Sequence, residues 1–375
     1  MKALIRIFSV LALAALMGCG GSSTSPKAIA FMYAVGQGSN NIFNFKQLAD
    51  GELQSAPVFI TATAPRPVAM AQTPSKNFLY VANLTSNVVS GFSVDHTTGV
   101  LAPVGNAIPP SPTGPQPIAV GVNSGSQFLF VLTKGDPAAI PLAIGPAISI
   151  FSIDSRGLLT AAGSAPTGAA PVVLVVSPTA AVLYVASGSP TATTITPFAI
   201  AANGALTAAA GGFTGPAGAN FAGLTIDSKG QFLYAADSGN NNVFSFSIGA
   251  GGALTPVAGS PFAAGTQTVS VAIDATSAFL YAANKGSNDI SAYKVNAGVL
   301  TTVTGSPFPA TASGVTTPAQ PAFLTMDPTN QFVYVGNPGS GNISGFAINI
   351  ADGSLVAVNN SPFGGVGASS IIITK

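Results

Sequence analysis

Side chains that could carry acid–base or metal chemistry are few in this sequence, and they lie far apart. The 375 residues include one histidine (His96), one glutamate (Glu52) and one cysteine (Cys19). Hydrolytic chemistry needs a base that activates water and a donor or cation that stabilises the negative charge that develops on the attacked group. His96 and Glu52 each stand in a short glycine-containing segment, DHTTG and ADGEL, where we interpret them as turn residues. No P-loop, HExxH motif or Cys/His cluster is present, so the sequence indicates no cofactor and no metal.

Arg66 is the residue best suited to ligand chemistry. It lies in APRPVAM, directly before an apolar segment, and the amide side chains Gln116 and Gln320 recur at matching positions. One arginine in a ring of amides can hold an anion or a carbonyl oxygen, although a solvated loop arginine is the simpler explanation.

Polar residues also recur directly after another apolar segment, at Asn83, Asp237, Asn284 and Asn337. Turn capping explains them as well as ligand contact does. A third recurring position holds aspartates in TIDSKG, AIDATS and TMDPTN, where we predict Asx turns. We predict Arg66 and Asp237 as candidate catalytic residues within a ligand-binding set of Arg66, Asn83, Gln116, Asp237, Asn284, Gln320 and Asn337.

The segments that position these residues are repeats. FLYVANLTSNVVSGFSV (78–94) recurs in closely similar form at 232–248, 279–295 and 332–348. Seven aromatic markers follow one another at intervals of 47 to 54 residues, and they are Tyr33, Tyr80, Phe130, Tyr184, Tyr234, Tyr281 and Tyr334. A period near 50 residues is typical of a β-propeller.

Each repeat contains four strand-like segments separated by Gly, Asn, Asp, Ser and Pro. In the second repeat they are residues 67–72, 77–83, 88–94 and 100–104. A strand such as FLYVA is apolar on both faces, which indicates a sheet covered on both sides. The first repeat starts at a second strand, and the chain ends with an isolated inner-strand segment, ASSIIITK. We therefore predict an all-β, seven-bladed propeller with four-stranded antiparallel blades, closed by pairing of the C-terminal strand with the N-terminal blade.

The repeats resemble the seven-bladed propellers of the lactonase family, of 6-phosphogluconolactonase and cycloisomerase-2 type, and the related surface propellers with YVTN repeats. The matching positions are strand and turn residues over 28–375, so the resemblance implies the fold more strongly than an activity. Family enzymes act on lactones or form them, and the resemblance implies catalytic His, Arg and Glu around the central channel. The histidine that members often place near Arg66 is absent here.

The N-terminus reads as a secretory signal. Residues 1–18 contain Lys2 and Arg6 followed by a short apolar stretch, and LMGC resembles the bacterial lipobox, which implies acylation at Cys19. Residues 19–27 would form the acylated cysteine and a flexible tether before the propeller at 28–375. We therefore predict a lipoprotein of the bacterial cell envelope, anchored extracytoplasmically at the outer membrane or periplasmic face; a plain signal peptide with an incidental cysteine is the alternative.

Two functions are compatible with these features. The first is a binding or scaffold module for an envelope protein or a carbohydrate-like ligand, because no convergent acid–base set is evident. The alternative is a lactonase-type hydrolase acting on a sugar lactone. The long apolar loop at 133–147 is a candidate lid or contact surface. Lack of a basic stripe argues against nucleic acid, and we expect a monomeric propeller.

Overall fold

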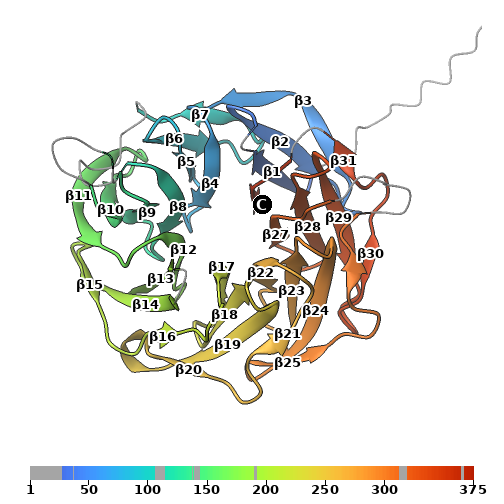
Figure 1. Cartoon of the computed structure of the whole chain (residues 1–375). Helices are drawn as coiled ribbons and strands as arrows, with labels where there is room; N and C mark the ends of the chain where they lie inside the picture. Colours follow the sequence, from blue (N-terminus) through green and yellow to red (C-terminus); the bar gives the residue numbers. More distant parts are fainter. Residues whose placement is uncertain are drawn as a thin grey trace, which may run out of the picture.

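The chain forms a ring of seven antiparallel sheets around a central opening (Figure 1). This computed structural model describes residues 28–375 except 37, 106–114, 137, 139–143, 190–191, 312–318 and 365–366. No helix within the described residues is long and apolar enough to span a membrane. The predicted all-β, seven-bladed propeller is confirmed.

Each blade runs from an inner strand at the central opening, through a second and a third strand, to an outer strand at the rim. Blade 2 comprises β4 (Pro67–Gln72), β5 (Phe78–Asn83), β6 (Val88–Val94) and β7 (Leu101–Pro103). Blade 3 comprises β8 (Pro117–Val122), β9 (Phe128–Thr133), β10 (Ala147–Ile153) and β11 (Leu159–Pro166).

In blades 4 to 7 a short fifth strand also pairs with the third strand, a feature that the repeat pattern does not predict. Blade 4 comprises β12 (Pro171–Val176), β13 (Val182–Ser189), β14 (Ala192–Ile200), β15 (Leu206–Ala208) and β16 (Phe213–Thr214). Blade 5 comprises β17 (Phe221–Ile226), β18 (Phe232–Asp237), β19 (Asn242–Ile248), the 3₁₀ turn η1 (Ala250–Gly252), β20 (Leu254–Pro256) and β21 (Phe262–Ala263).

The last two of these blades follow the same plan. Blade 6 comprises β22 (Thr268–Ile273), β23 (Phe279–Asn284), β24 (Asp289–Asn296), β25 (Val299–Thr302) and β26 (Phe308–Pro309). Blade 7 comprises β27 (Phe323–Met326), β28 (Phe332–Asn337), β29 (Asn342–Ile348), β30 (Leu355–Ala357) and β31 (Phe363–Gly364).

Blade 1 joins the two ends of the described chain. Its strands from the axis outward are β32 (Ser370–Thr374), β1 (Ala30–Val35), β2 (Asn41–Gln47) and β3 (Leu53–Ala62). The two terminal strands pair antiparallel, with Tyr33 opposite Ile372. This pairing covers the inner edge of β1 and closes the ring, as the sequence predicts.

The apolar core is divided among the interfaces between neighbouring blades. Among the described residues, seven clusters occur, and each joins two adjacent blades. Between blades 2 and 3, for example, Tyr80 and Val89 pack with Leu129 and Phe151. Because each sheet is buried on both faces, its strands are apolar on both sides, and few positions are left for the 6% of residues that are charged.

Among the described residues, the tyrosine of the repeated second strand links a blade to the next one in four of the seven blades. Its hydroxyl donates a hydrogen bond to a backbone carbonyl in the hairpin that follows the third strand of the neighbouring blade. Four such bonds are present, from Tyr33 to Gly99 (2.9 Å), Tyr80 to Gly157 (2.8 Å), Tyr281 to Gly353 (2.9 Å) and Tyr334 to Gly51 (2.7 Å). In these four blades the tyrosine therefore joins neighbouring blades as well as forming part of the second strand.

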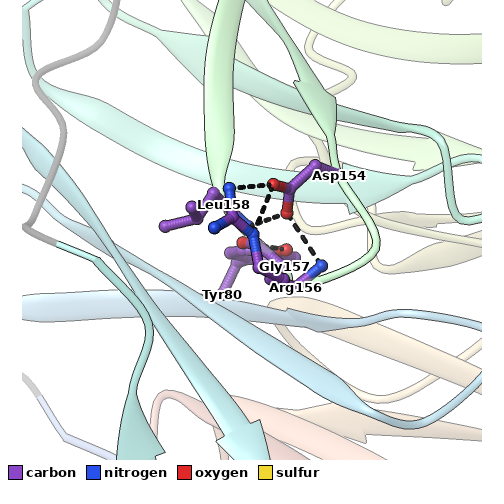
Figure 2. Close-up of polar contacts among 5 residues, drawn as sticks. All are labelled: Tyr80, Asp154, Arg156, Gly157 and Leu158. Carbon is purple, nitrogen blue, oxygen red and sulfur yellow. Dashed lines mark hydrogen bonds and ion pairs between the residues drawn. The ribbon is translucent and has the colours of Figure 1, made fainter.

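Figure 2 shows this joint between blades 2 and 3. Asp154 shapes the hairpin by accepting hydrogen bonds from the backbone N–H of Arg156 (2.9 Å) and Leu158 (2.8 Å). Gly157 has φ of +81°, and a Cβ there would overlap the ring of Phe78. Burial, together with nearby Asp154, raises the pKa of Tyr80 well above its ordinary value, so the phenol remains a protonated donor.

The predicted Asx turns are present at the ends of the inner strands of blades 5 to 7. Asp327 is buried, and its Oδ1 accepts hydrogen bonds from the backbone N–H of Gln331 and Phe332, both at 2.8 Å. Asp227 and Asp274 make the same pair of bonds in their own blades. These carboxylates hold the turn into the second strand.

Candidate functional site

The predicted site residues all belong to one face of the ring, here called the mouth. It is formed by the loops between second and third strands and by the loops from each outer strand to the next inner strand. His96 and Glu52 lie in hairpins of the opposite face. His96 is exposed, whereas Glu52 is half-buried. Neither side chain belongs to the face that carries the other candidates.

Residues directly before the inner strands share an unusual backbone conformation. Five of them have φ between +46° and +62°, and they are Arg66, Gln116, Ala170, Gln267 and Gln320. This left-handed conformation costs a non-glycine residue roughly 1–2 kcal/mol. The same geometry in five blades arranges these positions around the opening of the central channel.

An asparagine of the preceding blade holds four of these residues. Its Oδ1 accepts a hydrogen bond from the backbone N–H, which offsets part of the conformational cost. The pairs are Asn40 with Arg66 (3.2 Å), Asn87 with Gln116 (2.8 Å), Asn241 with Gln267 (2.7 Å) and Asn288 with Gln320 (2.8 Å). The asparagine of each second-to-third-strand loop thus positions the mouth of the next blade.

The carbonyls of the same residues fix the position that follows each second strand. Backbone N–H groups donate to them in the pairs Leu84 to Arg66 (2.9 Å), Lys134 to Gln116 (3.1 Å) and Lys285 to Gln267 (2.9 Å). The side chains of Arg66, Lys134 and Lys285 are exposed. The described part of the mouth therefore presents three cationic groups on a repeated framework.

The described residues line at least three hollows at the mouth. One of about 430 Å³ occupies the channel and is lined by residues of the inner strands. A second, of about 670 Å³, lies over blade 4, with Lys134 and Asn220 among its lining residues. A third, of about 530 Å³, lies over blade 7 beside Lys285. Each has the size of a small-molecule site.

The predicted ligand contacts Asn83, Asn284 and Asn337 are fully buried. Each Nδ2 donates to a serine two residues into the third strand, in the pairs Asn83–Ser90 (3.0 Å), Asn284–Ser291 (2.9 Å) and Asn337–Ser344 (2.9 Å). These bonds give the asparagines a part in shaping the loops of the mouth. Their contact with a ligand stays a prediction.

Asp237 occupies the same position in blade 5 but has a different environment. Phe244 replaces the serine in the strand register. The carboxylate is fully buried; its Oδ1 accepts hydrogen bonds from the backbone N–H of Asn220 (2.7 Å), Gly239 (3.0 Å) and Asn240 (3.2 Å), and Oδ2 has no partner among the described residues. Since Asn220 lines the hollow over blade 4, Asp237 supports the wall of that hollow.

The remaining predicted residues reach the surface of the mouth. Gln116 is half-buried and lines the hollow over blade 4, whereas Gln320 is exposed. The fold brings all seven predicted residues to one face, spread over blades 2, 3, 5, 6 and 7. No group of three or more His, Cys, Asp or Glu residues able to hold a metal occurs in the described part of the chain.

Two functional candidates, Lys134 and Lys285, are missed by the sequence reasoning. Their positions in the repeat could have indicated them, because each lysine directly follows a second-strand segment, in FLFVLTK and FLYAANK. Of the long loop at 133–147, the structure describes the base, where Asp136 and Ile144 form an isolated bridge. Residues 137 and 139–143 lie outside the described residues, and the role of this loop as a lid stays a prediction.

Comparison with known protein families assigns this architecture. The family model for the seven-bladed β-propeller lactonases matches residues 26–114 and 207–307, slightly more than half of the chain. The chain belongs to the lactonase propeller family. No curated protein matches this family member in sequence.

Solved structures share the fold of this lactonase propeller over nearly their whole length. A protein described as a 6-phosphogluconolactonase from Bacteroides uniformis has a TM-score of 0.77 at 18% identity, covering 92% of this chain and 99% of that chain. One of the same description from Bacteroides fragilis has 0.75 at 18% identity, with 92% and 98% covered. The periplasmic gluconolactonase of Pseudomonas aeruginosa has 0.75 at 17% identity, with 92% and 99% covered.

Proposed function

We propose that this protein is a lactonase-type hydrolase that opens a sugar lactone at the mouth. The observation that carries the proposal is a lactonase-family propeller whose mouth places cationic side chains beside hollows of small-molecule size. Structural neighbours named as 6-phosphogluconolactonase and gluconolactonase support the same substrate class. This interpretation is favoured over the binding or scaffold role expected first from the sequence.

The proposed chemistry is addition of water to the lactone carbonyl. Negative charge develops on the carbonyl oxygen, and collapse of the tetrahedral intermediate breaks the ring ester bond to give a hydroxy acid. Groups aimed at such an oxyanion commonly supply the largest single contribution to catalysis. We assign this role to Arg66, which the hydrogen bond from its backbone to Asn40 holds at the channel opening.

Asp237 acts in this proposal as a positioning residue. Its Oδ1 holds the backbone of Asn220 at 2.7 Å, and Asn220 forms part of the hollow over blade 4. Replacing Asp237 would move this wall. We expect that change to raise the KM for a lactone more than it lowers kcat.

A lactone panel with the purified chain from residue 20 onward tests the proposal. Arg66→Ala should lower kcat/KM by about 100-fold or more if it holds the oxyanion. Arg156→Ala is the matched control, because Arg156 is an exposed arginine in a hairpin of the opposite face. Binding of a lactone without turnover would return the protein to the binding-module class and overturn the hydrolase proposal.

We further propose that the protein is a lipoprotein anchored through Cys19 in the bacterial cell envelope. Residues 1–27 lie outside the described residues, so the support is the sequence of the N-terminus. The described chain enters blade 1 at β1, which runs from the opposite face toward the mouth. An anchor at Cys19 would thus leave the mouth accessible. Palmitate labelling that is lost in Cys19→Ser supports the anchor, and unlabelled soluble wild-type protein contradicts it.

A further inference from the structure

The channel hollow adjoins both the hollow over blade 4 and the hollow over blade 7. The channel hollow shares Val172 with the hollow over blade 4, and it shares Ala322 and Ser369 with the hollow over blade 7. Blades 4 and 7 lie on opposite sides of the central opening in Figure 1. The three hollows therefore follow one another across the mouth, and we refer to them together as the trough.

The trough has a lysine at each end. Lys134 lines the hollow over blade 4 and Lys285 lines the hollow over blade 7. The two lysines occupy the same position in their blades, directly after the second strand, and are held by equivalent backbone hydrogen bonds to Gln116 and Gln267. Among the described residues lining the three hollows, these lysines are the titratable side chains. The trough is therefore cationic at both ends, with a neutral middle.

The walls between the lysines suit a sugar chain. Phe43 in the hollow over blade 7 and Phe323 in the channel are half-buried rings that offer apolar surface to the faces of pyranose units. Gln116, Asn220 and Ser369 offer groups that both donate and accept hydrogen bonds, as sugar hydroxyls require.

Size distinguishes a chain from a single sugar. Each hollow alone falls within the roughly 300–1,000 Å³ that holds one small molecule. The joined trough is larger than that range, with parts of about 670, 430 and 530 Å³. A monosaccharide lactone would fill one part and meet one lysine.

We propose that the trough binds a linear acidic oligosaccharide that spans the mouth and places a carboxylate on Lys134 and another on Lys285. This inference takes only the sugar chemistry of the ligand from the proposed function. It concerns the length and charge of the ligand, which lactone hydrolysis alone does not require.

Isothermal titration calorimetry with oligogalacturonates, from the monomer to the hexamer, tests the proposal. We expect the affinity to rise with chain length until one oligomer reaches both lysines, and then to level off. Uncharged maltooligosaccharides of equal length should bind more weakly. Lys134→Ala and Lys285→Ala should each weaken binding of the longest oligomer about fivefold, and the double variant about twentyfold, as expected for exposed charge pairs. Raising the salt concentration should reduce the difference in affinity between the wild type and the lysine variants.

Lys229→Ala is the control, because Lys229 is exposed in a turn of the opposite face and should leave the affinity unchanged. Three results would overturn the proposal that an acidic oligosaccharide spans the trough. They are an affinity that does not depend on chain length, equal binding of uncharged chains, and a loss of affinity in only one of the two lysine variants. Calorimetry reports binding without turnover, so the two proposals fail separately. Lactone turnover without length dependence removes only the trough, and length dependence without turnover removes only the hydrolase.

Discussion

The joint between blades predicts a sharp contrast between two tyrosines of the same repeat. Tyr80 donates a hydrogen bond to the carbonyl of Gly157 at 2.8 Å, whereas the hydroxyl of Tyr234 has no partner among the described residues. Both rings are fully buried. Changing either tyrosine to phenylalanine removes one oxygen and keeps the packing.

The expected magnitudes follow from the fate of the buried polar groups. Tyr80→Phe leaves the carbonyl of Gly157 without this donor and should lower the free energy of unfolding by about 1–3 kcal/mol. Tyr234→Phe removes a buried hydroxyl that lacks a partner, so stability should stay the same or rise by up to about 1 kcal/mol. Gly157→Ala should lower the free energy of unfolding more than Tyr80→Phe does. The left-handed backbone costs an alanine about 1–2 kcal/mol, and its Cβ would also overlap the ring of Phe78.

Equilibrium urea unfolding, followed by far-UV circular dichroism, measures these differences. The slope with urea should match among the variants, so that a shift in midpoint reports stability alone. Equal losses in Tyr80→Phe and Tyr234→Phe would refute the hydrogen-bonded joint and reduce the repeated tyrosine to a packing residue. A Gly157→Ala variant as stable as the wild type would refute the need for glycine at this turn.

Three further predictions follow from the fold. Burial raises the pKa of the repeated tyrosines, to about 12 for Tyr184, so the folded protein keeps protons that the unfolded chain releases above pH about 10. The free energy of unfolding should therefore fall with rising pH, by up to about 1.4 kcal/mol per pH unit for each such tyrosine. Phenolate absorbance that appears before the loss of circular dichroism would contradict this. Asp327→Ala should lower the free energy of unfolding by about 1–2 kcal/mol, because it removes the acceptor for the backbone N–H of Gln331 and Phe332. Asp50→Ala, at an exposed aspartate, is the control. Equal losses of stability in the two variants would refute the role of Asp327 in the turn. Removal of residues 368–375 should uncover the inner edge of β1 and promote association, measured by light scattering, whereas a monomer of unchanged stability would show that closure by β32 is dispensable.

The architecture could be predicted from the sequence because the blades recur at a nearly constant spacing. The spacing of the aromatic markers set the number of blades, and the unmatched ends, 28–35 and 368–375, predicted the closing pair that the structure confirms. The link from Tyr80 to Gly157 could not be seen in the same way, because it joins residues 77 positions apart in different blades. Each partner has a sufficient local explanation, the tyrosine as a strand residue and the glycine as a turn residue.

The mouth could be located from the sequence, but the role of each side chain could not. Arg66 and Gln116 stand where the loop positions indicate, and the structure adds the left-handed backbone that they share. The buried state of Asn83 depends on its bond to Ser90, a cross-strand contact that requires the register. Lys134 and Lys285 could not be predicted as site residues, because single lysines in loops are usually solvated. The structure adds that each of them lines a hollow at the mouth.

The proposed lactone hydrolysis can be measured as acid release from sugar lactones, at constant pH, with the purified chain from residue 20 onward. Each turnover frees one carboxylic acid, so base uptake counts ring-opening events without a coupled assay. We expect uptake well above the spontaneous rate for at least one aldonolactone, lost in Arg66→Ala and retained in Arg156→Ala. Uptake at the spontaneous rate across the panel, or equal uptake by both variants, would contradict it.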